Sequence, residues 1–446
     1  MNKSENLIQR DSESISEVMK LRFYPFVVER AKGAYMYDPE GKKYLDFGAG
    51  WGVANLGYGH PRIIEAVTRQ MEKLSFSGPI SAIEEQSILL AEELISMTPG
   101  DFKKSVWYGH SGSDANEFIA KIVPIATGRP KILSFIGSYH GQTMGAYAMS
   151  GHPSQSKITA GGDVIKVPYP YCCRCAFDKE PDSCGLFCLK YIQDYVFEFV
   201  SDPAQIGAVI VEAVQCDGGD VVPPAGFLLE LENLCRKHNI LFIVDEVKAG
   251  LGRTGKLFAF NNFDVTPDAV VVGKPLGCGL PLSAVVGRRD LMDSVTAAHL
   301  FTTAGNSVSC AAAREGLKII KDEQLNENAI LQGKYLSNAF MALKNKYDCI
   351  LETRGIGLLQ GIELVKDRHA KEPDATLTAK VNYRAFELGL IHFYAGVFNN
   401  VLEFTPPLII SRSQAEEAVK IIDQSIGDAL SGKISDEKIA PYAGWD

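Results

Sequence analysis

Asp268-Ala-Val-Val-Val-Gly-Lys274 runs directly into the turn Pro275-Leu-Gly-Cys-Gly-Leu-Pro281. The first segment is an apolar run typical of a buried strand, and the second is rich in the residues that break strands and helices. Lys274 therefore closes a buried strand and opens a loop. Burial of an unpaired ammonium costs free energy. A lysine at this position indicates chemistry, because a desolvated lysine is neutral and nucleophilic.

A second apolar run, Ile240-Leu-Phe-Ile-Val-Asp245-Glu246, ends in carboxylates. A strand-end acid and a strand-end lysine are the arrangement expected of an enzyme that uses pyridoxal 5'-phosphate (PLP). There the acid holds the pyridinium nitrogen and the lysine holds the aldehyde. Two ordinary junctions between strands and helices are the alternative. Together the two stretches favour a PLP enzyme centred on Lys274 and Asp245.

Length and composition exclude several classes of protein. The chain has 446 residues with 46% hydrophobic content, enough for a large core and more than one domain. Its formal net charge of −9 is dispersed, which argues against nucleic acid as a partner. No apolar run reaches the roughly 18 residues of a membrane span, and the polar start Met1-Asn-Lys-Ser-Glu-Asn6 does not resemble a signal peptide. We expect a cytoplasmic protein without a membrane partner.

The order of patterns predicts an α/β fold. Apolar runs at 105–108, 131–135, 208–212, 240–245 and 269–273 alternate with helical patterns such as Phe227–His238. This alternation predicts a mostly parallel central sheet flanked by helices. We predict an N-terminal segment over 1–55, a large PLP-binding domain over 56–315 and a smaller α+β domain over 316–446. The N-terminal segment contains a hairpin at 33–46. The small domain has helices near 326–346 and 375–388 and strands near 350–363, and a long helix near 308–321 leads into it.

Five of the ten cysteines crowd into one stretch: Cys172, Cys173, Cys175, Cys184 and Cys188. Their spacing does not match paired C-x2-C zinc units. A disulfide would be unusual in the cytosol. A metal site, a redox bridge and free thiols all stay open for this cluster, and we assign no metal to the catalytic site.

Three further segments follow strand ends. Gly109-His-Ser-Gly-Ser-Asp-Ala-Asn-Glu117 places Gly112 and Ser113 at a helix N-terminus, which suits a phosphate, although a plain helix cap is the alternative. Tyr139 follows another strand and has the right chemistry to stack on a flat ring, or to be a core aromatic. Glu212 and Asp217 follow a third strand, where ligands bind in such sheets, although Asp217 before two glycines also suits a turn.

Three motifs in order resemble class III aminotransferases, which are fold-type I PLP enzymes. They are Asp245-Glu-Val-Lys-Ala-Gly-Leu-Gly-Arg-Thr-Gly255, Gly273-Lys-Pro-Leu-Gly-Cys-Gly-Leu-Pro-Leu282 and Thr302-Thr-Ala-Gly-Asn306. The similarity extends over residues 20–445. Within that class the chain resembles α-amino-ε-caprolactam racemase and related amino-acid racemases most, for example at Trp51-Gly-Val-Ala-Asn-Leu-Gly-Tyr-Gly-His60.

The resemblance implies a role for each matching residue. Lys274 is the Schiff-base lysine and Asp245 pairs with the pyridinium nitrogen. Val247 and Tyr139 pack on the two faces of the ring, and Gly112 and Ser113 bind the phosphate. Thr302 reaches the phosphate of the neighbouring subunit, so a homodimer or a dimer of dimers with shared active sites is expected. Trp51 lines the substrate pocket.

Two departures from the aminotransferase pattern favour a racemase. Asp217 stands in Gln215-Cys-Asp-Gly-Gly219 where these aminotransferases usually have glutamate, and Glu403 stands where many have a carboxylate-binding arginine. A racemase needs a second acid/base group across the cofactor from its lysine. Asp217 is our candidate, and we expect burial to raise its pKa. The predicted function is a PLP-dependent racemase or epimerase of amino acids, including aminolactams. A class III aminotransferase acting on an amino acid or ω-amine is the alternative, and a PLP-binding protein without turnover is the third.

Overall fold

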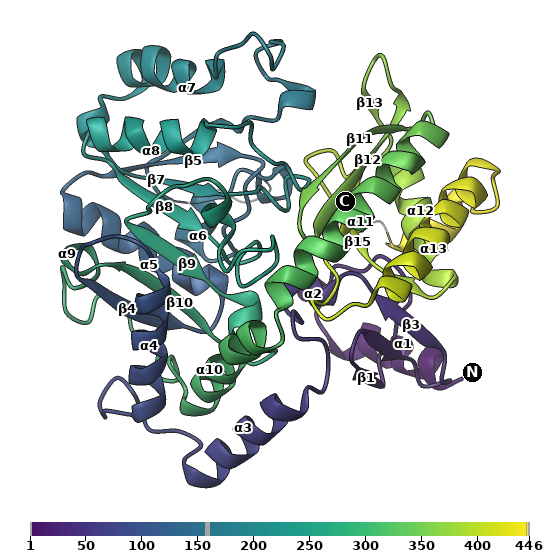
Figure 1. The fold of residues 1–446 in the computed structure, drawn as a ribbon, viewed down its shortest axis with the longest axis horizontal. Coiled ribbons are helices and arrows are strands. Elements are labelled where there is room, and N and C mark those ends of the chain that lie inside the picture. The colour runs from purple at the N-terminus through teal and green to yellow at the C-terminus, as the bar shows by residue number, and fades with distance from the viewer. Residues whose placement is uncertain (1, 157–160, 443, 445–446) are drawn as a thin grey trace.

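The computed structural model describes residues 2–156, 161–442 and 444. Within these residues seven strands form a central sheet in the order β4-β10-β9-β8-β7-β5-β6 (Figure 1). Strands β9, β8, β7, β5 and β6 are parallel, and β10 is antiparallel to both β9 and β4. The predicted mostly parallel sheet is confirmed. The strands are β4 (Lys104–Gly109), β5 (Lys131–Ile136), β6 (Val164–Pro168), β7 (Ile206–Glu212), β8 (Leu241–Asp245), β9 (Ala269–Val272) and β10 (Ser283–Arg288).

Both faces of this sheet are buried, which explains the continuous apolar runs in the sequence. Because successive side chains of a strand point to opposite faces, Val209 belongs to one hydrophobic core and Ile210 to the other. Helix α8 (Phe227–Lys237) contributes to the first core, and α5 (Gly112–Thr127) contributes to the second. The other helices of this region are α3 (Pro61–Lys73), α4 (Glu85–Met97), α6 (Met144–Met149), α7 (Phe187–Tyr191) and α9 (Arg289–Met292).

A second, smaller region follows the long helix α10 (Ser307–Asp322) and lies beside the large sheet (Figure 1). Its antiparallel strands run in the order β11-β12-β16-β15, with β13 paired to β12. The predicted helices near 326–346 and 375–388 are present, and helix α13 was not predicted. The elements are α11 (Leu325–Lys346), β11 (Ile350–Ile356), β12 (Leu359–Asp367), β13 (Glu372–Pro373), α12 (Ala375–Glu387), β15 (Phe393–Ala395), β16 (Val401–Phe404), α13 (Arg412–Leu430) and α14 (Asp436–Ile439).

The N-terminal segment joins the smaller region through a strand. The predicted hairpin forms with a turn in which the Gly41 amide donates to the Asp38 carbonyl over 3.0 Å. Its second strand pairs in parallel with β14, placing Leu45 beside Leu390. The domain boundaries at residues 55 and 315 stay a prediction. The elements are α1 (Lys3–Ser14), β1 (Arg30–Lys32), β2 (Tyr35–Tyr37), β3 (Lys43–Asp46), α2 (Ala49–Gly52) and β14 (Leu390–Ile391).

The described helices include none that is both long enough and apolar enough to cross a membrane.

Candidate active site

The carboxyl ends of the parallel strands meet at one edge of the large sheet, where a cavity of about 390 Å³ opens. Strand β7 ends at Glu212, β8 ends at Asp245, and Lys274 follows β9. Ligands of open α/β sheets bind at this edge. Most of the predicted site residues line this cavity: Lys274, Asp217, Asp245, Val247, Tyr139, Gly112 and Ser113.

Lys274 begins a tight turn immediately after β9. Its φ of +36° lies in the left-handed region, which a residue with a side chain adopts only under local strain. Such strain persists where the surrounding structure imposes it, and it clusters at active sites. The buried strand β9 before the lysine and Pro275 after it provide that constraint.

Asp245 is held by three donors. Its Oδ2 accepts hydrogen bonds from His140 Nδ1 over 2.7 Å and from Asn116 Nδ2 over 2.8 Å, and its Oδ1 accepts one from the Val247 amide over 2.9 Å. The carboxylate is buried. These bonds fix one orientation of the Asp245 carboxyl group at the cavity, as a partner of a ring nitrogen requires. Sequence reasoning missed His140 and Asn116 as supports, although Asn116 lies in the segment 109–117 and His140 directly follows Tyr139.

The start of helix α5 has the properties of a phosphate site. Ser111 caps the helix by accepting a hydrogen bond from the Asp114 amide. The amides of Gly112 and Ser113 lie in the first turn, where the helix itself offers no acceptor. A Cβ added at Gly112 would lie 2.6 Å from Val247 Cγ1, so only glycine allows this close approach. The helix N-terminus therefore presents free donors to an anion at the cavity wall.

Tyr139 completes a set of groups that fits PLP. Its hydroxyl accepts a hydrogen bond from Gln142 Nε2 over 2.9 Å, and burial raises its pKa, so the phenol stays neutral. An aromatic ring, an anion cup, a fixed carboxylate and a lysine thus surround one cavity. These are the groups needed for the ring, phosphate, ring nitrogen and aldehyde of that cofactor.

A buried ion triad lies beside this set. Lys248 Nζ donates to Asp217 Oδ1 over 2.7 Å, and to the two carboxylate oxygens of Glu403 over 2.6 and 2.9 Å. All three side chains are buried. Lys248 follows β8 of the large sheet and Glu403 lies on β16 of the smaller region, so the triad joins the two regions at the cavity. Sequence reasoning noted Glu403 and assigned no role to Lys248.

The expected raised pKa of Asp217 is wrong. Burial pushes its pKa upward, but the ammonium of Lys248 and then that of Lys274 outweigh burial and lower the pKa to about 2. The sequence argument considered burial alone and lacked the lysine. Asp217 is therefore a carboxylate at neutral pH. Glu212 behaves in the opposite way, since burial and the neighbouring Asp245 and Asp217 raise its pKa well above the ordinary value.

Two predicted site residues do not line the cavity described above. Trp51, with φ of +64°, stacks on Phe393 with ring centroids 4.3 Å apart, and its ring lies 5.1 Å from Lys248 Nζ. It therefore flanks the triad. Thr302 lies on an exposed segment of its own chain. Their predicted roles toward substrate and toward a neighbouring subunit stay predictions.

Comparison with known proteins gives the same picture along the whole chain. The model of the class III aminotransferase family matches residues 16–426. The alanine/serine racemase of Pyrococcus horikoshii is 38% identical over 439 residues, which cover 97% of this chain and 92% of that protein. The 4-aminobutyrate aminotransferase GabT of Escherichia coli is 35% identical over 433 residues, 96% of this chain and 100% of that protein. The omega transaminase from Pseudomonas jessenii in complex with PMP superimposes with a TM-score of 0.87 at 29% identity, covering 97% of this chain and 99% of that one.

Proposed function

This chain belongs to the class III aminotransferase family and uses pyridoxal 5'-phosphate, and from that premise we propose that it is an amino-acid racemase. Its substrate is an amino acid or aminolactam, and Lys274 and Asp217 exchange protons with the substrate Cα on opposite faces. The observation that carries the proposal is a second proton-handling group, the Asp217 carboxylate, in the same cavity as Lys274.

The number of acid/base groups separates the two reactions of this family. Bound PLP supplies an electron sink that acidifies the Cα–H bond of an amino acid joined to it. An aminotransferase needs one group, Lys274, to carry the proton from Cα to the cofactor. A racemase needs a second group to return a proton to Cα from the other side. Asp217 is the candidate for this group, because it faces the cavity and is ionised at neutral pH. As a carboxylate it can accept the Cα proton of the enantiomer that faces it, and the acid formed in that step can return the proton.

The charge of Lys274 ties the two groups together. Lys274 is the second positive charge that lowers the pKa of Asp217, after Lys248. When Lys274 is neutral, that influence disappears and Asp217 holds a proton more readily. When Lys274 carries a proton, Asp217 is a carboxylate ready to accept one. The charge of Lys274 therefore affects how readily Asp217 accepts a proton, which suits a racemase that uses both groups.

Lys248 positions Asp217 for its role as the second acid/base group. Its ammonium fixes Oδ1 of Asp217 and neutralises part of the charge of Glu403, so that Lys248 holds the Asp217 carboxylate in position. The same triad replaces the arginine that grips a substrate carboxylate in many aminotransferases of the family. A lysine already bound by two carboxylates has no favourable charge left for a third. The carboxylate of an amino-acid substrate is therefore held elsewhere in the cavity, and an aminolactam substrate has no carboxylate to hold.

We propose that the enzyme is a homodimer or a dimer of dimers. Thr302 is exposed on its own chain, and in this arrangement it reaches the phosphate in the neighbouring active site. Both family resemblance and the absence of Thr302 from the wall of its own described cavity favour this assembly.

An aminotransferase is the second candidate, and the 35% identity to 4-aminobutyrate aminotransferase over nearly the whole chain favours it. The two functions differ in their need for an acceptor. Purified PLP-loaded protein is incubated with a panel of L-amino acids and α-amino-ε-caprolactam without any keto acid, and the products are separated by chiral chromatography. The racemase predicts the D-enantiomer. If no D-enantiomer forms, and amino transfer appears once 2-oxoglutarate or pyruvate is added, the protein is an aminotransferase and the racemase proposal is wrong.

A further inference from the structure

A second cavity lies away from the active site, in the insertion between β6 and β7. Its volume of about 30 Å³ is enough for one or two water-sized occupants. Four cysteines line this cavity, together with aromatic and apolar residues that include Phe177 and Phe187. The four are Cys172, Cys175, Cys184 and Cys188. All four thiols are free of disulfides.

The four cysteines come as two pairs from two segments. Cys172 begins the single turn η3 (Cys172–Arg174) and Cys175 follows its end, which gives a C-x2-C pair. Cys188 lies in the first turn of α7, and Cys184 lies four residues earlier, before the helix begins, which gives a C-x3-C pair. The exposed loop 176–183 joins the pairs. Two short-spaced pairs on turns that face one cavity are the arrangement of a structural metal site.

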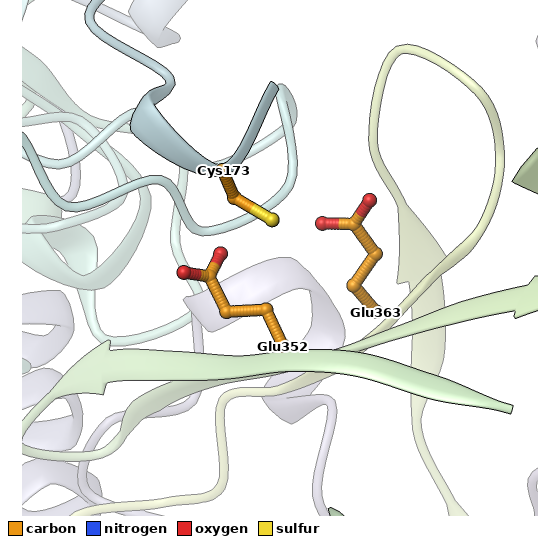
Figure 2. Close-up of side chains that lie close together, drawn as sticks. All are labelled: Cys173, Glu352 and Glu363. Atoms are coloured by element: carbon orange, nitrogen blue, oxygen red, sulfur yellow. The ribbon is translucent and has the colours of Figure 1, made fainter. Parts of the chain in front are cut away.

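The fifth cysteine of the cluster is in a different environment. Figure 2 shows the sulfur of Cys173 facing the carboxylates of Glu352 and Glu363, and these ligand atoms lie within 4.8 Å of one another. Both carboxylates are already paired with Arg354 Nη1, over 2.7 and 2.6 Å, and Glu363 is also bound by Arg174. A cation placed there would face two guanidinium groups, so this group is an ion-pair network. Cys173 is therefore separate from the other four and provides a matched control.

We propose that Cys172, Cys175, Cys184 and Cys188 bind one structural Zn²⁺ per chain. The four thiols lose their protons to solvent and form four Zn–S bonds, which is the closed tetrahedral set that structural zinc prefers. The resulting centre carries two negative charges. Lys179, which lines the same cavity, offsets part of that charge. Sequence spacing had left this cluster undecided, because it did not separate Cys173 from the others.

Zinc binding requires a contraction of the two segments. In the part of the chain that the structure describes, no three of these four sulfurs lie within 4.8 Å of one another. A tetrahedron with Zn–S bonds of about 2.3 Å places sulfurs about 3.8 Å apart, so the sulfurs move closer together when zinc binds. The sulfurs of Cys172 and Cys184 make weak contacts with carbonyl groups, Cys172 with Pro170 at 3.8 Å and Cys184 with Pro181 at 3.6 Å.

The arrangement of the cluster favours a cation. The four cysteines line one small cavity, so thiolates there would lie close together and repel one another. A divalent ion between them removes that repulsion and deprotonates its ligands.

The segment that carries the first cysteine pair is also connected to the loop that carries Asp217. Tyr171, which precedes the first cysteine pair, hydrogen-bonds Arg354 Nη2 over 2.7 Å. Arg354 Nε in turn donates to the Gly219 carbonyl over 2.7 Å, two residues after Asp217. Arg354 therefore connects the segment with the first cysteine pair to the loop that carries Asp217.

The test measures metal content in the full-length protein. Wild type, Cys175→Ser and the control Cys173→Ser are produced with Zn²⁺ in the medium, passed over a desalting column and analysed by plasma mass spectrometry. Wild type and Cys173→Ser are expected to retain one zinc per chain, and Cys175→Ser to lose most of it. A loss of zinc from Cys175→Ser is informative only if that variant folds. A second measurement therefore uses proteins that keep all four cysteines, and Co²⁺ is exchanged into wild type and Cys173→Ser. Thiolate-to-cobalt charge-transfer bands with the visible bands of tetrahedral Co²⁺ are expected in both.

Four results would overturn the zinc assignment. They are wild-type protein without zinc, equal zinc in Cys175→Ser and wild type, iron in place of zinc, and peptide maps that show disulfides among the four cysteines. None of these measurements depends on catalytic turnover, so they test the zinc proposal independently of the racemase proposal.

Discussion

Replacing Lys248 with methionine removes the one ammonium that Asp217 and Glu403 share. In the wild type this ammonium lies 2.7 Å from Asp217 Oδ1 and 2.6 Å from Glu403 Oε2, with all three groups buried. Methionine keeps most of the volume of the lysine stem and leaves two carboxylates side by side without their common partner. The variant therefore tests the charge of Lys248 separately from its packing.

The expected loss follows from the pKa of Asp217. Its pKa falls from 3.8 to about 2 in spite of burial. At about 1.4 kcal/mol per pKa unit, that shift alone represents roughly 2 kcal/mol of stability at neutral pH. Glu403 loses the same partner, and removal of one member of a buried ion pair costs about 3–5 kcal/mol. We therefore expect Lys248→Met to lose about 3–5 kcal/mol at pH 7.

The pH dependence has a definite sign. In the wild type the depressed pKa of Asp217 stabilises the fold fully above pH 4, and that contribution disappears as the pH falls from about 4 towards 2. In Lys248→Met, burial without that lysine moves the pKa of Asp217 upward, so the carboxyl group ionises more easily in the unfolded chain and the folded state loses stability as the pH rises. The difference in stability between the two proteins should therefore be larger at pH 8 than at pH 5.

The assay combines thermal unfolding with kinetics. Unfolding of wild type, Lys248→Met and Lys248→Met/Glu403→Leu is followed by circular dichroism at pH 5 and pH 8, and kcat/KM is measured over the same range. The double variant removes one of the two uncompensated carboxylates, so it should be more stable than the single variant. Lys248→Met should gain an acidic limb in kcat/KM that the wild type lacks above pH 5. Equal unfolding temperatures for wild type and Lys248→Met, or a double variant less stable than the single one, would refute the triad.

Three further substitutions test the cofactor cavity. Removing the 2.7 Å bond to Asp245 by His140→Ala should weaken PLP retention about 10- to 100-fold, the effect of one hydrogen bond to a charged group, as seen in cofactor absorbance after dialysis; unchanged retention would remove His140 from the site. Gly112→Ala places a Cβ 2.6 Å from Val247 Cγ1 and should abolish stable cofactor binding, whereas Gly161→Ala, which meets no atom within 4 Å, should bind PLP normally; equal binding by both variants would contradict the phosphate cup. Glu212→Gln replaces an acid whose pKa is raised well above its ordinary value with a neutral amide, so kcat/KM at pH 7 should stay within about threefold of wild type, and a large loss would mean that the carboxylate form is needed.

The sequence predicts those parts of the site that depend on local pattern. Lys274 and Asp245 were located because each ends a continuous apolar run, and the ends of parallel strands meet at one edge of a sheet. Gly112 and Ser113 were located because a helix N-terminus follows a strand. These inferences need only short segments and their order along the chain.

The missed contacts are long-range. Lys248 and Glu403 are 155 positions apart, and they meet only because the smaller region packs against the large sheet. His140 and Asp245 are 105 positions apart and lie on different strand-end loops. The pKa of Asp217 was predicted in the wrong direction for the same reason, since its burial was foreseen and its cationic partner was not. These contacts were missed because their residues are far apart in the sequence, and not because the interactions are weak.

Cα proton exchange in Asp217→Asn tests the central claim most directly. The variant is incubated in D₂O with each enantiomer of the substrate found in the chiral assay, and loss of the Cα proton is followed by NMR. The account predicts that racemisation stops, while the enantiomer whose Cα proton faces Lys274 still exchanges at a rate near that of the wild type and its mirror image does not. Equal loss of exchange for both enantiomers, or continued racemisation, would contradict the assignment of Asp217 as the second base.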